Sequence, residues 1–169
     1  VATTLFVGVD SLGDARMIDR NTIERIVRSA IDELIENDRY LLEMDAQEEA
    51  VSGRLAAYID KSDSIAGPLR VTTEYNRHGD AIKQLLLPRL NRRNGDWSVR
   101  NVRPDIIVHE PGNDKNNLLV LEVKKPGQPL HFDRVKLEAY LSQLHYAYAA
   151  HVVLGIRSGS VVRKIIWKN

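Results

Sequence analysis

Residues 103–127, which read RPDIIVHEPGNDKNNLLVLEVKKPG, constrain the fold of this chain more than any other segment. Two mostly apolar runs, at 106–108 and 118–123, flank a group of Pro, Gly, Asn and Asp residues at 111–117. Apolar runs separated by residues of this kind are typical of two antiparallel strands joined by a turn. The segment therefore predicts a β-hairpin with a longish loop.

The loop length determines which residues lie opposite each other across this hairpin. With a loop at 111–116, Asp105 lies opposite Glu122 with both carboxylates on one face, and Lys124 follows on the same face. The other face carries apolar residues, namely Pro104, Ile106, Val108, Leu119, Leu121 and Val123. Two adjacent carboxylates on a half-buried sheet repel each other and lose hydration, so a neighbouring cation is expected.

A divalent cation would balance both acids, which Lys124 alone cannot do. Mg²⁺ suits the pair because it prefers carboxylate oxygens, needs few protein ligands and keeps waters that can act as nucleophiles, and Mn²⁺ is the expected substitute. Lys124 could then contact a phosphate or orient the attacking water. In the alternative interpretation, Asp105 and Glu122 belong to an edge-of-sheet ion-pair network with Arg103, Lys124 and Lys125.

The pair Pro104-Asp105, followed by Glu122-Val123-Lys124, resembles the PD-(D/E)XK signature of the restriction-endonuclease-like nuclease superfamily. Over residues 45–157 the chain looks like small stand-alone bacterial members of undefined substrate. The resemblance implies Asp105, Glu122 and Lys124 as catalytic residues. It also implies a metal held by Asp105, Glu122 and the Val123 carbonyl.

The resemblance further implies an α/β fold, a restriction-endonuclease-like sandwich with a central mixed β-sheet flanked by helices. The implied activity is Mg²⁺-dependent hydrolysis of phosphodiester bonds, in DNA above RNA, of a restriction, repair or defence type. The competing hypothesis is a catalytically idle module on the same fold that binds nucleic acid or protein. Cleavage of both strands of a duplex would favour a homodimer.

A helix expected at 45–60 supplies a further candidate ligand. Glu48 shares the apolar stripe of this helix, whereas Glu49 is rotated away from it. Since the resemblance implies that a glutamate from the helix before the sheet completes the metal site, Glu48 is the first choice and Glu49 the reserve. Equally, Asp45 and Glu48 have the spacing of a capping box, in which Glu48 only satisfies the helix start.

Three other residues are candidate accessory groups. Glu74 is either a further acidic ligand or the surface partner of Arg77 or Lys83. Lys136 and Gln143 share one stripe of the helix expected after the hairpin, and the resemblance implies that a glutamine or basic residue from this helix reaches into the site. Their other interpretation is an exposed polar flank of that helix.

The remaining periodicity predicts one domain over residues 1–169, with a core at about 45–168. Residues 19–37, capped by Asp19 or Asn21, predict a leading amphipathic helix, and residues 1–16 are expected to be a variable extension that precedes the domain. The other expected elements are strands at 69–76, 151–157 and 161–168, a strand or short helix at 81–90, and a helix at 132–150.

The formal net charge is only +1, so binding of nucleic acid must depend on a local basic patch. The best candidate patch, weighed equally against a solvated loop, contains Arg89, Arg92, Arg93, Arg100 and Arg103. The absence of cysteine excludes thiolate metal sites. No apolar run approaches the length of a membrane span, so we expect a cytoplasmic protein without a membrane partner.

Overall fold

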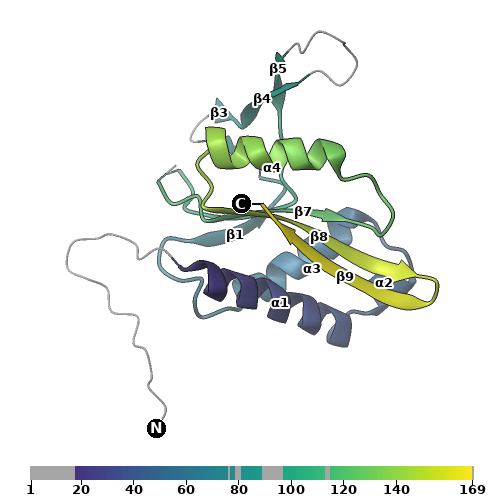
Figure 1. The fold of residues 1–169 in the computed structure, drawn as a ribbon. Helices are drawn as coiled ribbons and strands as arrows, with labels where there is room; N and C mark the ends of the chain where they lie inside the picture. Colours follow the sequence, from purple (N-terminus) through teal and green to yellow (C-terminus); the bar gives the residue numbers. More distant parts are fainter. Residues whose placement is uncertain (1–17, 76, 79–80, 89–96, 113–114, 169) are drawn as a thin grey trace.

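The computed structural model describes residues 18–75, 77–78, 81–88, 97–112 and 115–168, and it contains a central five-stranded sheet (Figure 1). In spatial order the strands are β1 (Arg70–Thr73), β6 (Ile106–His109), β7 (Leu119–Lys124), β8 (Tyr148–Arg157) and β9 (Ser160–Trp167). Strands β7 and β8 are parallel, whereas the other neighbours are antiparallel. The predicted α/β fold with a mixed sheet is therefore confirmed.

Helices cover both faces of this sheet, as Figure 1 shows. Helices α1 (Arg20–Asn37) and α3 (Glu48–Asp60) pack on one face, where Ile106 and Leu121 point. Helix α4 (His131–Gln143) packs on the other, where Ile107 and Val120 point. Both faces of β6 and β7 are buried because successive strand residues alternate between two apolar cores. No helix within the described ranges is both long and apolar enough to cross a membrane.

The two N-terminal helices agree with the predicted periodicity, although the second begins later. Asp19 caps α1, and its side chain accepts a hydrogen bond from the Thr22 amide at 3.1 Å. The helix predicted from position 45 begins at Glu48, because a short helix, α2 (Tyr40–Glu43), precedes it. Asp45 follows α2 with φ 51°, a left-handed conformation that cannot belong to a helix.

The helix predicted at 132–150 is too long at its C-terminal end. Helix α4 stops at Gln143, and the parallel strand β8 begins at Tyr148. His145 has φ 54°, which breaks the helical path. The apolar spacing that suggested a longer helix arises because Leu144 and Ala149 also enter the core beneath α4.

A second, small sheet lies against α4. Strands β4 (Gln84–Pro88) and β5 (Trp97–Asn101) form this ribbon, and β2 (Arg77–His78) pairs with β3 (Ala81–Ile82). Strand β4 falls within the segment predicted as strand or helix, whereas β5 was not predicted. Leu85 and Leu87 are buried, while Leu86, Trp97 and Val99 are exposed. The ribbon thus has one face in the core and one apolar face towards solvent.

Gly155 of β8 lies against the ring of Pro126, so we expect Gly155→Ala to destabilise the protein. A Cβ atom at position 155 would lie 2.6 Å from Pro126 Cδ, and the proline ring has little freedom to move away. Overpacking of this kind costs about 1–3 kcal/mol. Chemical denaturation would measure the change in the free energy of unfolding.

Gly53→Ala is the matched control for this substitution. Gly53 lies inside α3 with no atom within 4 Å of a Cβ at that position, so alanine should stabilise the protein by about 0.5–1 kcal/mol. Equal effects of the two substitutions would contradict the close packing of Gly155 on Pro126.

Candidate active site

The register of the β6–β7 hairpin is the one that the sequence predicts. Ile106 pairs with Leu121 and Ile107 with Val120, and the same register places Asp105 opposite Glu122. The Val123 amide donates a hydrogen bond of 2.7 Å to Asp105 Oδ2. This hydrogen bond fixes the Asp105 side chain next to Val123.

Four carboxylates and two amines meet near the end of β7. We call them the acid–lysine cluster, which consists of Glu48, Asp105, Glu122, Lys124, Asp133 and Lys136. Lys136 Nζ lies 2.7 Å from Glu122 Oε1 and 3.4 Å from Asp133 Oδ1. Lys124 Nζ lies 3.8 Å from Asp133 Oδ2. The two lysines therefore share Asp133, while Glu122 pairs with Lys136.

The contact between Lys136 and Glu122 is an ion pair without good hydrogen-bond geometry. Glu122 is 1% exposed, and its Oε1 atom has no hydrogen-bond partner within the part of the chain that the structure describes. A short distance between an amine and a carboxylate oxygen with an unfavourable hydrogen-bond angle gives charge attraction but leaves a lone pair of the oxygen unsatisfied. Glu122 is thus buried, and its Oε1 atom is in contact with the Lys136 ammonium without a well-directed hydrogen bond.

Glu48 extends from the start of α3 into this cluster. Its carboxylate accepts hydrogen bonds from Lys124 Nζ at 3.1 Å and from the Lys125 amide at 3.3 Å. The predicted capping box is absent, because Gln47 occupies the N-cap position and makes no side-chain cap bond. Asp45 instead pairs with Lys125 at 2.6 Å. The local geometry thus joins Glu48 to the end of β7 rather than to its own helix start.

Burial raises the pKa of Glu122 to about 8, and the nearby Asp105 adds to this increase although Lys136 opposes it. Burial likewise raises the pKa of Asp105. For Lys124 burial alone would lower the pKa, but Glu48, Asp133 and Asp105 together outweigh it and raise the pKa above its usual value. Lys124 is therefore a charged group at neutral pH and is unsuited to act as a general base.

The donor chemistry of the cluster fits one hard divalent cation. Four carboxylates and two ammonium groups leave two uncompensated negative charges when all six groups are ionised. Across the described ranges, no three His, Cys, Asp or Glu side chains already converge as a metal cage. Mg²⁺ commonly takes only one or two carboxylates and keeps several waters. Two carboxylates would therefore be enough side-chain ligands for such an ion.

The side chains of three predicted accessory residues lie outside the acid–lysine cluster. Gln143 uses its side-chain amide on the ribbon, since its Nε2 donates to the Leu86 carbonyl at 3.0 Å and its Oε1 accepts from the Leu86 amide at 2.9 Å. The Glu74 amide donates a hydrogen bond of 3.2 Å to the Asp105 carbonyl, but the Glu74 carboxylate forms an exposed ion pair of 3.3 Å with Arg103. Glu49 is exposed on α3, as its rotation from the apolar stripe predicted.

The predicted basic patch is described only in part. Arg89, Arg92 and Arg93 lie outside the described residues. The guanidinium of Arg100 lies 5.7 Å from the ring centroid of Phe132, the residue before Asp133. Arg103 precedes Asp105 by two positions and is exposed. Both arginines therefore come shortly before Asp105 in the chain.

Sequence reasoning missed two residues near the acids. Asp133, which is 7% exposed, lies three positions before Lys136 on α4 and so on the same side of that helix. That spacing could have identified it. His151 pairs with Glu122 in the parallel β7–β8 register. No local pattern indicated this neighbour, because the predicted helix ran to position 150.

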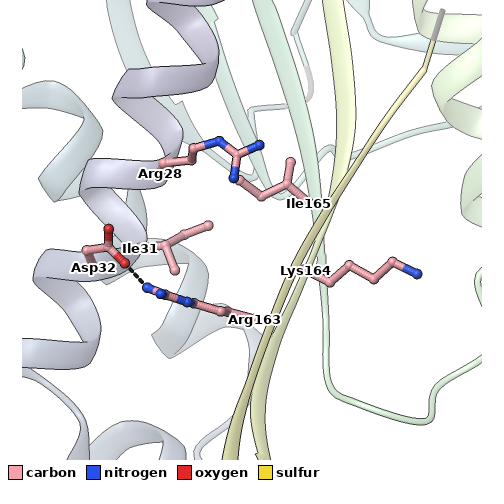
Figure 2. A pocket seen from close by; sticks show the side chains of 6 residues that line it. All are labelled: Arg28, Ile31, Asp32, Arg163, Lys164 and Ile165. Carbon is pink, nitrogen blue, oxygen red and sulfur yellow. Dashed lines mark hydrogen bonds and ion pairs between the residues drawn. The ribbon is translucent and has the colours of Figure 1, made fainter.

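A surface pocket between α1 and β9 is separate from this cluster (Figure 2). It is lined by Arg28, Ile31, Asp32, Arg163, Lys164 and Ile165. Arg163 pairs with Asp32, and Figure 2 shows the Lys164 side chain pointing away from both. Ile165 packs against the core beneath α1, whereas Glu122 faces α4. The pocket therefore opens on the opposite side of the sheet.

Comparisons with known proteins add little to this geometry. No family model matches the chain, and no curated protein matches it. Among solved structures, the crystal structure of SSO0001 is similar over 86% of this chain and 77% of its own, with 18% sequence identity and a TM-score of 0.32. A similarity this low supports no conclusion about fold or function.

Proposed function

We propose that this chain is a Mg²⁺-dependent nuclease that hydrolyses phosphodiester bonds in DNA, as a member of the PD-(D/E)XK superfamily. The observation that carries the proposal is the placement of Asp105 opposite Glu122, with Lys124 two residues further along β7. A buried acid with a pKa raised to about 8 indicates carboxylates whose charge is incompletely balanced by the protein. Such perturbed groups are typical of functional sites.

In this proposal Asp105 and Glu122 hold the cation, with the Val123 carbonyl as a further ligand. When bound, Mg²⁺ would activate a water and stabilise negative charge on the phosphate. Glu48 acts by holding Lys124 and the Lys125 amide, which sets the end of β7 against α3. It is therefore an orienting group of the site, with a metal contact as its alternative role.

Lys124 supplies fixed positive charge to the scissile phosphate. Its ammonium is 3.1 Å from Glu48 and 3.8 Å from Asp133, so it is held between two acids from different helices. An amine with a raised pKa stabilises a phosphate charge without giving up a proton. Arg100 and Arg103 are the described residues that we assign to contacts with the DNA backbone.

We further propose that the reaction takes place in the cytoplasm. A homodimer would be the form that cuts both strands of a duplex.

A cleavage assay tests the proposal directly. The purified protein should degrade DNA in Mg²⁺ or Mn²⁺ and should leave it intact in excess EDTA. Lys124→Gln should reduce cleavage by about 100-fold, because one charged contact to the reacting phosphate is lost. If both single- and double-stranded DNA stay intact in Mg²⁺ and in Mn²⁺, the proposal of nuclease activity is wrong.

Two observations favour an idle binding module as the second candidate function. Lys136 already lies 2.7 Å from Glu122, as a structural ion pair would require. The β4–β5 ribbon also presents Leu86, Trp97 and Val99 to solvent, which is unusual for large apolar side chains that share one face. Thermal unfolding with increasing Mn²⁺ separates the two functions: a metal-dependent rise in Tm is expected for the nuclease, and none for the module.

A further inference from the structure

Among the described residues, His151 stands out as a completely buried histidine. It is 0% exposed, and neither Nδ1 nor Nε2 has a partner within the described part of the chain. His109, which is also buried, differs because its Nε2 lies 3.1 Å from Thr72 Oγ1. A buried ring N–H without an acceptor costs about 1–3 kcal/mol, so such groups normally have a protein, water or ligand partner.

The sheet places His151 next to Glu122. The two residues pair in the parallel register of β7 and β8, and adjacent strands lie about 4.8 Å apart. Residues paired in this way point to the same face, which here is the face covered by α4. Burial lowers the pKa of His151, while the nearby Asp133 opposes this decrease. His151 therefore belongs to the same buried layer as the acids.

The unsatisfied groups of these neighbours are complementary. Glu122 Oε1 lies 2.7 Å from Lys136 Nζ but has no hydrogen-bond partner within the described ranges, while a neutral imidazole always carries one N–H donor. We propose that His151 is a positioning residue that holds the Glu122 carboxylate through one ordered water bridging the two side chains. The inference rests on the proposed metal site and adds a residue to it.

Such a contact would orient a metal ligand before the cation binds. Ligating carboxylates are themselves held by hydrogen bonds, and loss of such a partner commonly weakens metal affinity or activity by about 10–100-fold. Because His151 is completely buried, it does not touch the DNA. Its removal should therefore change metal affinity and kcat and leave KM for DNA unaltered.

Binding of Mn²⁺, measured by titration calorimetry and by loss of the free-ion electron paramagnetic resonance signal, tests this role. We expect His151→Leu to weaken Mn²⁺ binding at least tenfold, and His151→Gln, which keeps an N–H donor, to recover most of the affinity. His145→Asn is the control, since His145 is exposed and asparagine tolerates its left-handed φ of 54°. This control should bind Mn²⁺ like the wild type.

The outcomes separate this inference from the proposed nuclease. If the wild type binds Mn²⁺ and both His151 variants bind it equally well, the positioning role is overturned while the metal site stands. If the wild type binds no Mn²⁺, both fail. Should His151→Leu not fold, ¹⁵N NMR of the wild-type ring gives the answer: its N–H resonance should shift in Glu122→Gln, and an unchanged resonance would overturn the inference.

Discussion

Asp105→Asn is expected to abolish Mg²⁺-dependent cleavage while leaving the fold intact. Asparagine keeps a side-chain oxygen that can accept the 2.7 Å hydrogen bond from the Val123 amide, so the end of the hairpin stays in place. It removes the negative charge that a divalent cation needs. Since loss of a group that only orients a metal ligand costs about 10–100-fold, loss of the ligand itself should exceed 100-fold.

The same substitution should remove metal-dependent stabilisation. Saturating the wild type with Mn²⁺ at 100 times its Kd adds about 2.7 kcal/mol to the free energy of unfolding. For a chain of this size that is a rise in Tm of about 5–10 °C. Asp105→Asn should show no rise, which differential scanning calorimetry would detect.

Asp32→Asn is the matched control for Asp105→Asn. It makes the same chemical change in an exposed ion pair with Arg163, on the α1 side of the sheet. It should keep both the cleavage rate and the metal-dependent rise in Tm. Cleavage by Asp105→Asn at the wild-type rate would exclude Asp105 as a metal ligand.

Glu122→Gln is expected to make the metal-free protein more stable at alkaline pH. The folded wild type keeps the Glu122 proton up to about pH 8, whereas the unfolded chain releases it near the ordinary value of 4.5. A raised pKa in the folded state means that stability is lost as the pH rises between these two values. The full loss is on the order of 5 kcal/mol as an upper value.

Glutamine has no proton to lose, so the variant lacks this pH dependence. In EDTA, the difference in free energy of unfolding between Glu122→Gln and wild type should be small at pH 4.5, should increase up to pH 8 and should then level off. Urea denaturation across this range would measure it. A constant difference from pH 4.5 to 9 would show that Glu122 is ionised throughout, as a permanent partner of Lys136.

The hairpin could be predicted from sequence because its information is local. The turn residues at 111–117 limit the loop length, and the period of two along each strand then sets both faces. This is why Asp105 and Glu122 were paired correctly. Helix α1 could also be predicted from the sequence, since its buried stripe is regular and Asp19 is a strong N-cap.

The errors occur where distant contacts decide the local structure. Residues 144–150 have helical spacing, but the pairing of β8 with β7 overrides it. Gln143 was expected near the acids, yet it bonds to a strand about sixty residues earlier that no periodicity connects to it. Glu48 could be proposed only by resemblance, because its contact with Lys124 spans more than seventy residues.

The connection from β7 through α4 to β8 gives the acid–lysine cluster two parts with different folding requirements. Glu122, Lys124, Asp133 and Lys136 fall within fifteen consecutive residues, so their meeting closes only a short loop and costs little chain entropy. Asp105 joins from the preceding strand, and Glu48 from far earlier in the chain. We therefore expect the lysines and two of the acids to come together early in folding, and docking of α3 to complete the group last.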